Sequence, residues 1–351
     1  MKFPDVVTVA QLAGFDEVID VRSPAEFAED HVPGAINCPV LDNEERAAIG
    51  TLYKQVSPFD AKKRGAALVA KNIARHIEEK FAAHGKGWRP LVYCWRGGKR
   101  SGAMTHILSE IGWHAAQLEG GYRAYRREVL AQLAELPRRL RYRVVCGATG
   151  SAKSRLLQAL AAAGAQVLDL EDLACHRGSV LGNLPEQPQP AQKMFDSLVW
   201  DALRKFDPDR VVYVEAESKK IGQLQVPGAL LDCMRASSCV LIEAPLAERV
   251  DFLVREYEHF LGDPRELKAK LDCLADLHSK ETLARWMQQI EQRHWSSLVA
   301  DLLENHYDPA YRRATLKNFK ELAQAQVLRP AKLDATALAR MAAQLIAQEQ
   351  A

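Results

Sequence analysis

The stretch Leu91–Met104, LVYCWRGGKRSGAM, places one cysteine at the mouth of a glycine-rich turn. The apolar run before Cys94 predicts a short buried strand, and the amphipathic segment that begins at Ala103 predicts a helix. In such a strand–loop–helix unit, backbone N–H groups of the loop and of the helix N-terminus point inward, where they hold an anion or favour a thiolate. The stretch therefore predicts a reactive cysteine in an anion-binding loop.

The loop that follows the cysteine has the composition such a cradle needs. Two glycines allow the chain to curl without Cβ clashes, and three cations add positive charge. The residues that we assign to this cradle are Arg96, Gly97, Gly98, Lys99, Arg100 and Ser101. We assign Cys94 as the catalytic residue. The alternative is a buried structural cysteine beside a tight turn, which rarely has so many glycines and cations around it.

The composition indicates a folded protein with more than one domain. The chain has 351 residues, 48% hydrophobic and 26% charged, which is enough for two domains with a core in each. A formal net charge of +2 does not by itself indicate a nucleic-acid partner. The seven cysteines lack CxxC or zinc-ligand spacing and fit a reducing compartment. The N-terminus lacks the pattern of a signal peptide and no run is long enough to span a membrane, so we expect a cytoplasmic protein without a membrane partner.

A second glycine-rich loop, GATGSAKS at Gly147–Ser154, follows a predicted strand at Tyr142–Cys146 and precedes a predicted helix. This is the context that a phosphate-binding P-loop requires, with the lysine on terminal phosphates and the serine on Mg²⁺. The residues that we assign to phosphate or diphosphate binding are Gly147, Thr149, Gly150, Ser151, Ala152, Lys153 and Ser154. Ala152 departs from the pattern, which has glycine there, and its Cβ could narrow the cradle or change the loop's dihedral angles.

Further polar residues in the second half are candidates for ligand contacts. Those that we assign as candidate tRNA or phosphate contacts are His176, Arg177, Arg249, Arg255, Tyr311, Arg312 and Arg313. Arg249 and Arg255 lie one face apart on a predicted helix, as in small-molecule kinases near their phosphates, and the cations beside Tyr311 suit phosphates and stacked bases. The alternatives are a capped loop with a solvated arginine and a solvated helix start. Glu215 or Glu217, at the end of a predicted strand, could orient a metal or be a surface carboxylate. No metal site is certain, and Ser154 is the candidate Mg²⁺ ligand.

Two motifs in the first half carry a resemblance to a known family. The sequence IDVRSPAEFAEDHVPGAIN at 19–37, followed by YCWRGGKRSG at 93–102, resembles the rhodanese family of sulfurtransferases. The resemblance implies that Cys94 carries a chalcogen as a persulfide or perselenide, cradled by the loop from Trp95 to Ser101.

We therefore predict an α/β fold: an N-terminal rhodanese-like parallel sheet with flanking helices, then a P-loop NTPase-like α/β domain with a helical C-terminal part. The expected boundaries are 1–125 for the rhodanese-like domain, 126–140 for a helical linker, 141–310 for the P-loop domain and 311–351 for a helical C-terminal tail.

The order of the two halves extends the resemblance. A rhodanese-like half before a P-loop, with DLEDLACHRGSVLG at 169–182, VEAESKKIG at 214–222 and HYDPAYRR at 306–313, resembles the tRNA 2-selenouridine synthase family. The resemblance implies an enzyme that alkylates a wobble 2-thiouridine of tRNA with geranyl diphosphate and then replaces the geranylthio group with selenium from selenophosphate. Both donors are substrates, Mg²⁺ is a candidate cofactor, no cofactor is expected to be firmly bound, and a selenophosphate-producing enzyme is a candidate partner.

The hypothesis that follows divides the chemistry between the two loops. Cys94 serves the selenium step, with Arg96 and Arg100 on the phosphate end, and the loop with Lys153 and Ser154 holds the diphosphate of the prenyl donor. Two other classes stay open: a rhodanese-type sulfurtransferase with a nucleotide-binding partner domain, and a non-catalytic tRNA- or nucleotide-binding module.

Overall fold

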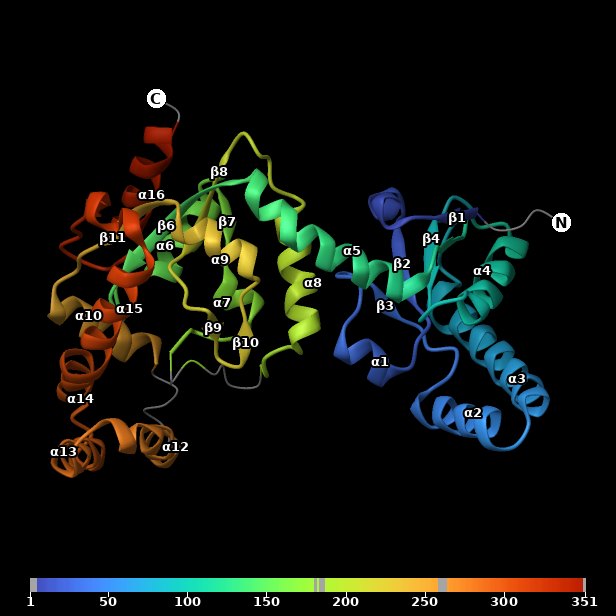
Figure 1. Ribbon diagram of the computed structural model, residues 1–351, viewed down its shortest axis with the longest axis horizontal. Coiled ribbons are helices and arrows are strands. Elements are labelled where there is room, and N and C mark those ends of the chain that lie inside the picture. The colour runs from blue at the N-terminus through green and yellow to red at the C-terminus, as the bar shows by residue number, and fades with distance from the viewer. Residues whose placement is uncertain (1–4, 180–181, 183–186, 258–263, 350–351) are drawn as a thin grey trace. The chain divides into compact units, whose positions relative to one another are not determined.

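The computed structural model describes residues 5–179, 182, 187–257 and 264–349. The chain divides into two compact units, one of Met1–Gln132 with Pro190–Asp201 and one of Leu133–Gln189 with Ala202–Ala351. Each unit is built around a five-stranded sheet in which every strand pairing is parallel (Figure 1). The predicted α/β class is confirmed.

The sheet of the N-terminal unit has the strand order β1-β5-β4-β2-β3. Its strands are β1 (Asp5–Val7), β2 (Glu17–Asp20), β3 (Ile36–Asn37), β4 (Pro90–Tyr93) and β5 (Ala116–Leu118). Its helices are α1 (Pro24–Glu29), α2 (Asn43–Gln55), α3 (Pro58–His76), α4 (Lys99–Ile111) and most of α5 (Gly121–Glu135) and α8 (Gln192–Leu203).

Local sequence explains the elements that surround the cysteine loop. All four residues of β4 are buried, as expected for the central strand of a parallel sheet. Helix α1 begins at a capping box between Ser23 and Glu26, with Pro24 at its first position. Helix α4 begins after Gly98, whose φ of 71° belongs to the left-handed region that glycine adopts readily. These elements place residue 94 at the carboxyl edge of the sheet, beside a helix N-terminus.

Part of α8 belongs to the N-terminal unit although it follows the P-loop in sequence. Ser197 Oγ donates to Asp30 Oδ1 at 2.8 Å, and Trp200 Nε1 donates to Gln132 Oε1 at 2.6 Å. We predicted this segment to lie within the P-loop domain at 141–310. The apolar face of a single helix does not indicate which sheet it covers, so sequence periodicity could not assign it.

The sheet of the C-terminal unit has the strand order β12-β11-β6-β8-β7. Its strands are β6 (Arg141–Gly147), β7 (Gln166–Leu168), β8 (Val211–Glu215), β11 (Ser238–Ile242) and β12 (Gln326–Leu328), and a separate antiparallel pair joins β9 (Lys220–Ile221) to β10 (Leu224–Gln225). Its helices are α6 (Lys153–Ala162), α7 (Leu170–Leu173), α9 (Gly228–Arg235), α10 (Leu246–Glu256), α12 (Pro264–Leu271), α13 (Lys280–Glu291), α14 (Trp295–Leu302), α15 (Asp308–Asn318) and α16 (Ala335–Glu349).

The segment 311–351 differs from the helical tail that the sequence predicted. Strand β12 pairs with β11 in the main sheet, and the apolar face of α16, which includes Leu338 and Leu345, packs into the same core as Leu156 of α6. The segment is therefore part of the P-loop domain. A strand of three residues carries too little periodicity to be recognised from sequence.

Helices α12, α13 and α14 have an apolar core apart from the sheet. Trp286 and Ile290 are fully buried there, with Leu271 and Leu298 around them. This layer follows α10 in the chain. No helix in the described part of the chain is both long and apolar enough to cross a membrane.

Candidate active site

The cysteine loop begins at Cys94, which is almost fully buried at the end of β4. The residue is only 2% exposed, and its neighbours in the core include Val92 and Met104. Its sulfur nevertheless has polar partners: Ser101 Oγ donates to Sγ at 3.3 Å, and Sγ lies 3.6 Å from the carbonyl oxygen of Arg96. The sulfur is thus shielded from bulk water while it faces the loop.

A glutamine on the neighbouring strand extends this hydrogen-bond chain. Gln117 Nε2 in β5 donates to Ser101 Oγ at 2.9 Å and lies 3.1 Å from the carbonyl oxygen of Gly98. Because Ser101 receives this bond, its own proton is free to go to the sulfur of Cys94 or to the carbonyl oxygen of Gly98, which lies 3.4 Å away. The same glutamine explains Gly98, where a Cβ would lie 2.2 Å from Nε2.

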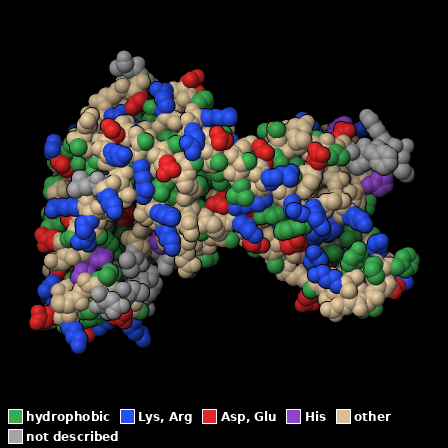
Figure 2. All heavy atoms as spheres, viewed as in Figure 1, with side chains coloured by type: hydrophobic (Ala, Val, Ile, Leu, Met, Phe, Trp, Pro, Cys, Tyr) green, Lys and Arg blue, Asp and Glu red, His purple; other side chains and the backbone are tan. Residues whose placement is uncertain are grey.

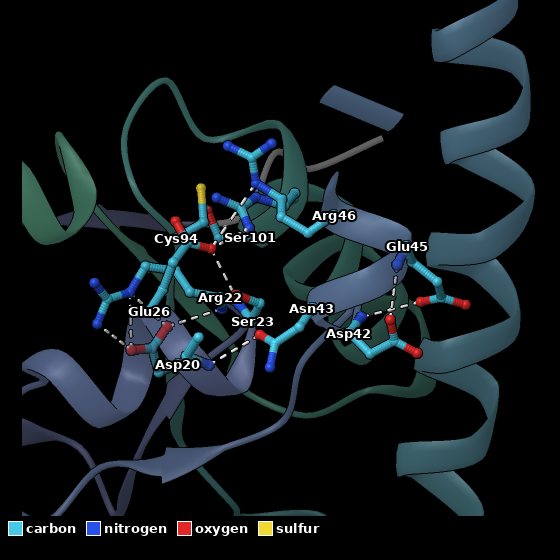
Figure 3. A network of polar contacts seen from close by, with 12 residues as sticks. Asp20, Arg22, Ser23, Glu26, Asp42, Asn43, Glu45, Arg46, Cys94 and Ser101 are labelled. Atoms are coloured by element: carbon cyan, nitrogen blue, oxygen red, sulfur yellow. Dashed lines mark hydrogen bonds and ion pairs between the residues drawn. The ribbon is translucent and has the colours of Figure 1, made fainter. Parts of the chain in front are cut away.

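The charges around the loop come from two further helices. Arg100 Nη1 lies 3.1 Å from Glu26 Oε2, and Arg46 Nε of α2 lies 3.9 Å from the same oxygen (Figure 3). Burial would raise the pKa of Glu26, but the hydrogen bond and charge of Arg100 hold it below its ordinary value. Arg96 and Lys99 are exposed, and Lys and Arg side chains gather on the face of this unit that Figure 2 shows. An arriving anion would therefore meet excess positive charge.

Beneath the loop lies a buried ion pair. Arg22 Nη2 contacts Asp20 Oδ2 at 2.6 Å with both side chains almost inaccessible, and the guanidinium carbon lies 4.0 Å from the centre of the Tyr122 ring (Figure 3). Tyr122 also stacks on Trp95, the first residue of the loop. The pair therefore supports the loop from below.

The second loop curls around the N-terminus of α6, between β6 and the helix. The N–H of Gly147 donates to Tyr311 Oη at 2.7 Å, and Lys153 Nζ lies 3.3 Å from Glu215 Oε1. Ala152 has φ 60° and ψ 33°, the left-handed conformation that glycine would adopt readily, and it packs with Leu156 in the core. The backbone therefore takes a glycine-like conformation despite the alanine.

Three carboxylates meet beside this loop. Ligand atoms of Glu171, Glu215 and Glu217 all lie within 4.8 Å of one another. Ser154 Oγ lies 2.9 Å from Glu171 Oε2 and 3.0 Å from Glu215 Oε2, so its single proton can go to either. Oxygen donors of this kind suit Mg²⁺, and the donor set therefore fits the ion that the P-loop pattern implies.

Burial and mutual repulsion make this carboxylate cluster costly without a cation. Burial, followed by the charge of Glu215, raises the pKa of Glu171 to about 8 and the pKa of Glu217 well above its ordinary value. Burial would lower the pKa of Lys153, but the charge of Glu215 holds it above its ordinary value. Glu215 and Glu217 are 4% and 8% exposed, so neither is the surface carboxylate that the sequence left as an alternative.

A cavity of about 590 Å³ opens in front of the loop and the carboxylates. We call it the main cavity, and its walls include Lys153, Glu217, His176, Arg177 and Tyr311. The volume lies in the range of small-molecule sites. Arg177 Nη1 donates to the carbonyl oxygen of Glu256 at 3.0 Å, and its guanidinium lies over the Tyr257 ring.

The candidate tRNA or phosphate contacts differ in where the structure places them. His176, Arg177 and Tyr311 line the main cavity. Arg255, Arg312 and Arg313 are exposed and do not line it, so they stay candidates for a larger partner.

Arg249 differs from its predicted role as a tRNA or phosphate contact. It is buried, its Nε donates to the carbonyl oxygen of Thr149 at 2.9 Å, and its two other nitrogens bind Asp308. Its donors are used within the protein because α15, which carries Asp308, returns to the loop from far along the sequence.

Some residues around the two loops were not recognised from the sequence. Gln117 and Arg46 join the cysteine loop from separate elements, and no local pattern distinguishes them from surface residues. Glu171 had a signal that could have been used: it follows the end of β7 as Glu215 ends β8, and parallel strands end at one edge of the sheet.

Fold and sites together define a class of protein, a rhodanese-like domain followed by a P-loop domain. The family model of the rhodanese-like domain matches residues 7–128, and the model of the tRNA 2-selenouridine synthase AAA domain matches residues 140–293. Curated relatives match across both halves. The chain belongs to the tRNA 2-selenouridine synthase family.

Three relatives illustrate the likeness, and each is a tRNA 2-selenouridine synthase. The protein from Nitrosomonas europaea is 31% identical over 81% of this chain and 75% of its own length. The protein from Bdellovibrio bacteriovorus is 34% identical over 81% of this chain and 74% of its own length. The protein from Cupriavidus pinatubonensis is 36% identical over 84% of this chain and 87% of its own length.

Proposed function

We propose that this protein converts the wobble 2-thiouridine of tRNA to 2-selenouridine in two steps. In the first step, the sulfur of the base attacks C1 of geranyl diphosphate, a C–S bond forms, and the C–O bond to diphosphate breaks. In the second step, selenium from selenophosphate attacks carbon 2 of the base, and geranylthiol leaves with a proton. Water then cleaves the Se–P bond and releases phosphate.

The observation that carries this proposal is the presence of two different loops on one chain whose side chains and backbone N–H groups suit an anion. One loop brings Ser101 to the sulfur of Cys94 and carries Arg100, which pairs with Glu26, and the other combines Lys153 with three carboxylates. Two donors that are both phosphate anions call for two such loops, and the alkylation makes the sulfur a better leaving group.

The residues of the P-loop unit would serve the first step. Lys153 and the backbone N–H groups of the loop would hold the diphosphate and stabilise the charge that develops on it as it leaves. Ser154, Glu171, Glu215 and Glu217 would hold Mg²⁺, which when bound neutralises part of the diphosphate charge. The N–H of Gly147 would exchange its hydrogen bond to Tyr311 for a phosphate oxygen.

The residues of the cysteine loop would serve the second step. Ser101 donates to the sulfur of Cys94, and Gln117 in turn donates to Ser101. Arg96 and Arg100 would hold the phosphate end of selenophosphate. Cys94 would guide the selenium of selenophosphate toward carbon 2 of the base without forming a bond to it.

The test separates the two steps by nucleoside analysis of tRNA incubated with pure protein, geranyl diphosphate and selenophosphate. Cys94→Ala should accumulate the S-geranyl nucleoside and form no 2-selenouridine, while Lys153→Ala should leave 2-thiouridine unchanged. Cys233→Ala and Lys332→Ala, which alter a half-buried cysteine and an exposed lysine outside both loops, should behave as the wild type. If both changes abolish the same step only, the division of labour is wrong.

One alternative function also fits the main cavity. A lysine, a serine and an acidic cluster at a P-loop also suit a magnesium–nucleotide complex. A rhodanese-type sulfurtransferase with a nucleotide-binding partner domain would turn over thiosulfate and bind ATP tightly. Those two measurements distinguish it from the tRNA-modifying enzyme.

A further inference from the structure

A second, smaller cavity adjoins the main cavity on the side of the helical layer. Its volume is about 70 Å³, and its walls are almost entirely hydrocarbon. The residues that line it include Leu253 of α10, Leu267 of α12, Leu298, Val299 and Leu302 of α14, and Tyr307. We call it the apolar cavity.

The two cavities share a wall. Thr149, Ser179, Leu253, Tyr257 and Tyr307 line both of them. Thr149 belongs to the phosphate-binding loop itself, so the apolar cavity begins where that loop ends. A ligand whose charged end binds the loop would have its other end directed at hydrocarbon walls.

The walls of the apolar cavity are parts of a packed core rather than an exposed surface. Leu298 is 2% exposed and Leu302 is 4% exposed, and both belong to the cluster around Trp286. Side chains around an unfilled void lose dispersion contacts on one side, so such a void tends to close unless a ligand makes up for them. Val299 lies at its edge and is only half-buried.

The chemistry of the combined space selects one class of ligand. The main cavity offers a lysine, a P-loop and carboxylates suited to a cation, which fit a diphosphate. The apolar cavity offers hydrocarbon, where the polar edge of a nucleotide base would lose its hydrogen bonds to water. A diphosphate joined to a branched hydrocarbon chain matches both halves.

We propose that the apolar cavity binds the distal isoprene unit of the prenyl diphosphate and thereby sets the length of chain that the protein accepts. This inference rests on the proposed function, which requires a prenyl donor. It adds where the hydrocarbon chain of that donor lies and which residues limit its length. Because the cavity is small, it takes one isoprene unit beyond the one next to the diphosphate. Val299 and Leu298 are the specificity-determining residues.

The test measures binding by titration calorimetry with the full chain and four probes: inorganic, dimethylallyl, geranyl and farnesyl diphosphate. The wild type should bind geranyl diphosphate at least about tenfold more tightly than dimethylallyl diphosphate, because hydrocarbon added in an apolar pocket is worth a factor of this order or more. Val299→Phe should fill the cavity and remove that preference, while its affinity for inorganic diphosphate stays within about twofold.

A second variant changes the cavity in the opposite direction. Leu298→Ala should enlarge the cavity and improve the binding of farnesyl relative to geranyl diphosphate severalfold. The inference can therefore be tested even if one of the two variants fails to fold. Leu277→Phe, at a 66% exposed leucine outside both cavities, is the matched control and should bind all four probes as the wild type does.

The outcomes separate this inference from the proposed function. If the protein binds geranyl diphosphate tightly and neither Val299→Phe nor Leu298→Ala changes the chain-length preference, the placement of the chain is overturned and the proposed function stands. If the wild type binds ATP tightly and no prenyl diphosphate, the proposed function and this inference are both overturned.

Discussion

Ala152 shows how one residue can depart from a motif and keep its geometry. A left-handed backbone at a residue other than glycine costs on the order of 1 kcal/mol or more, and Ala152 has φ 60° within the loop. The loop backbone on either side of Ala152, from Gly150 to Lys153, therefore follows the path that a glycine at position 152 would give it. In return, its methyl group packs with Leu156 in the core.

These opposing effects predict a small change for Ala152→Gly. The glycine relieves the backbone strain but loses a buried methyl group and gains freedom in the unfolded chain, so the free energy of unfolding should change by less than about 1 kcal/mol. Diphosphate affinity should be retained. Ala152→Val should lose about 2 kcal/mol or more, because a β-branched residue is poorly tolerated in this conformation. Denaturant unfolding and diphosphate titration check both, and a stable, tightly binding valine variant would contradict the account.

Some residues of the two loops could be predicted from the local sequence, and others could not. Cys94 and Lys153 were placed from contiguous motifs, since strand, loop and helix follow one another within about a dozen residues. Gln117 was not, because its bond to Ser101 depends on how β5 pairs with β4. Pairing of this kind joins residues that no short motif contains.

At the scale of elements, α15 is attached to the glycine-rich loop at 147–154 at two points. Arg249 of α10 binds the carbonyl oxygen of Thr149 and, through its other nitrogens, Asp308 in the first turn of α15. Tyr311, one turn later, accepts the N–H of Gly147. The loop is thus held from outside its own strand–loop–helix unit.

This arrangement predicts that Asp308→Asn weakens diphosphate binding. The change leaves the buried charge of Arg249 without its partner, which costs on the order of 1–3 kcal/mol, and the loop loses the fixed position of Thr149. The dissociation constant for geranyl diphosphate should rise about tenfold or more, equivalent to at least about 1.4 kcal/mol.

A second ion pair of the same chemistry serves as the control. Arg285 and Asp301 join two helices at the surface, where Arg285 is 48% exposed, and surface pairs contribute little. Asp301→Asn should therefore leave diphosphate binding unchanged. Equal losses in the two variants, measured by calorimetry, would show that Arg249 has no special connection to the loop.

The domain boundary predicted at residue 310 differs from the structure because strand pairing joins segments that are far apart in the chain. Strand β12 consists of three residues, and its membership of the sheet depends on pairing with Val240–Ile242, more than eighty residues earlier in the chain. Parallel order, by contrast, was expected from strands that alternate with helices, and that class of fold is what the structure has.

At the scale of the whole molecule, the N-terminal unit is completed by a helix from beyond the P-loop. Ser197 of α8 is fully buried and donates to Asp30, which also accepts a bond from Tyr122. Trp200 packs edge-on against Tyr125 in the same unit. The rhodanese-like match ends at residue 128, so the unit extends beyond its family pattern.

Removing this contact should destabilise the N-terminal unit. Ser197→Ala deprives the buried carboxylate of one donor, which costs about 1–3 kcal/mol, so the thermal transition of this unit should move to lower temperature. Ser296→Ala, at an exposed position of α14, should change stability by no more than about 0.5 kcal/mol. Calorimetry of the full chain checks both, and an unchanged transition in Ser197→Ala would mean that α8 does not support the unit.

The late arrival of α8 has a consequence during synthesis on the ribosome. All five strands of the N-terminal sheet have been translated by Leu118, yet the serine that binds Asp30 is added 79 residues later, 197 minus 118. At translation speeds of about 5–20 residues per second, the nascent sheet waits on the order of ten seconds for its last helix. During that interval the emerging chain would keep Asp30 and the ring of Tyr125 open to water, and exposed apolar surface of this kind is what chaperones bind.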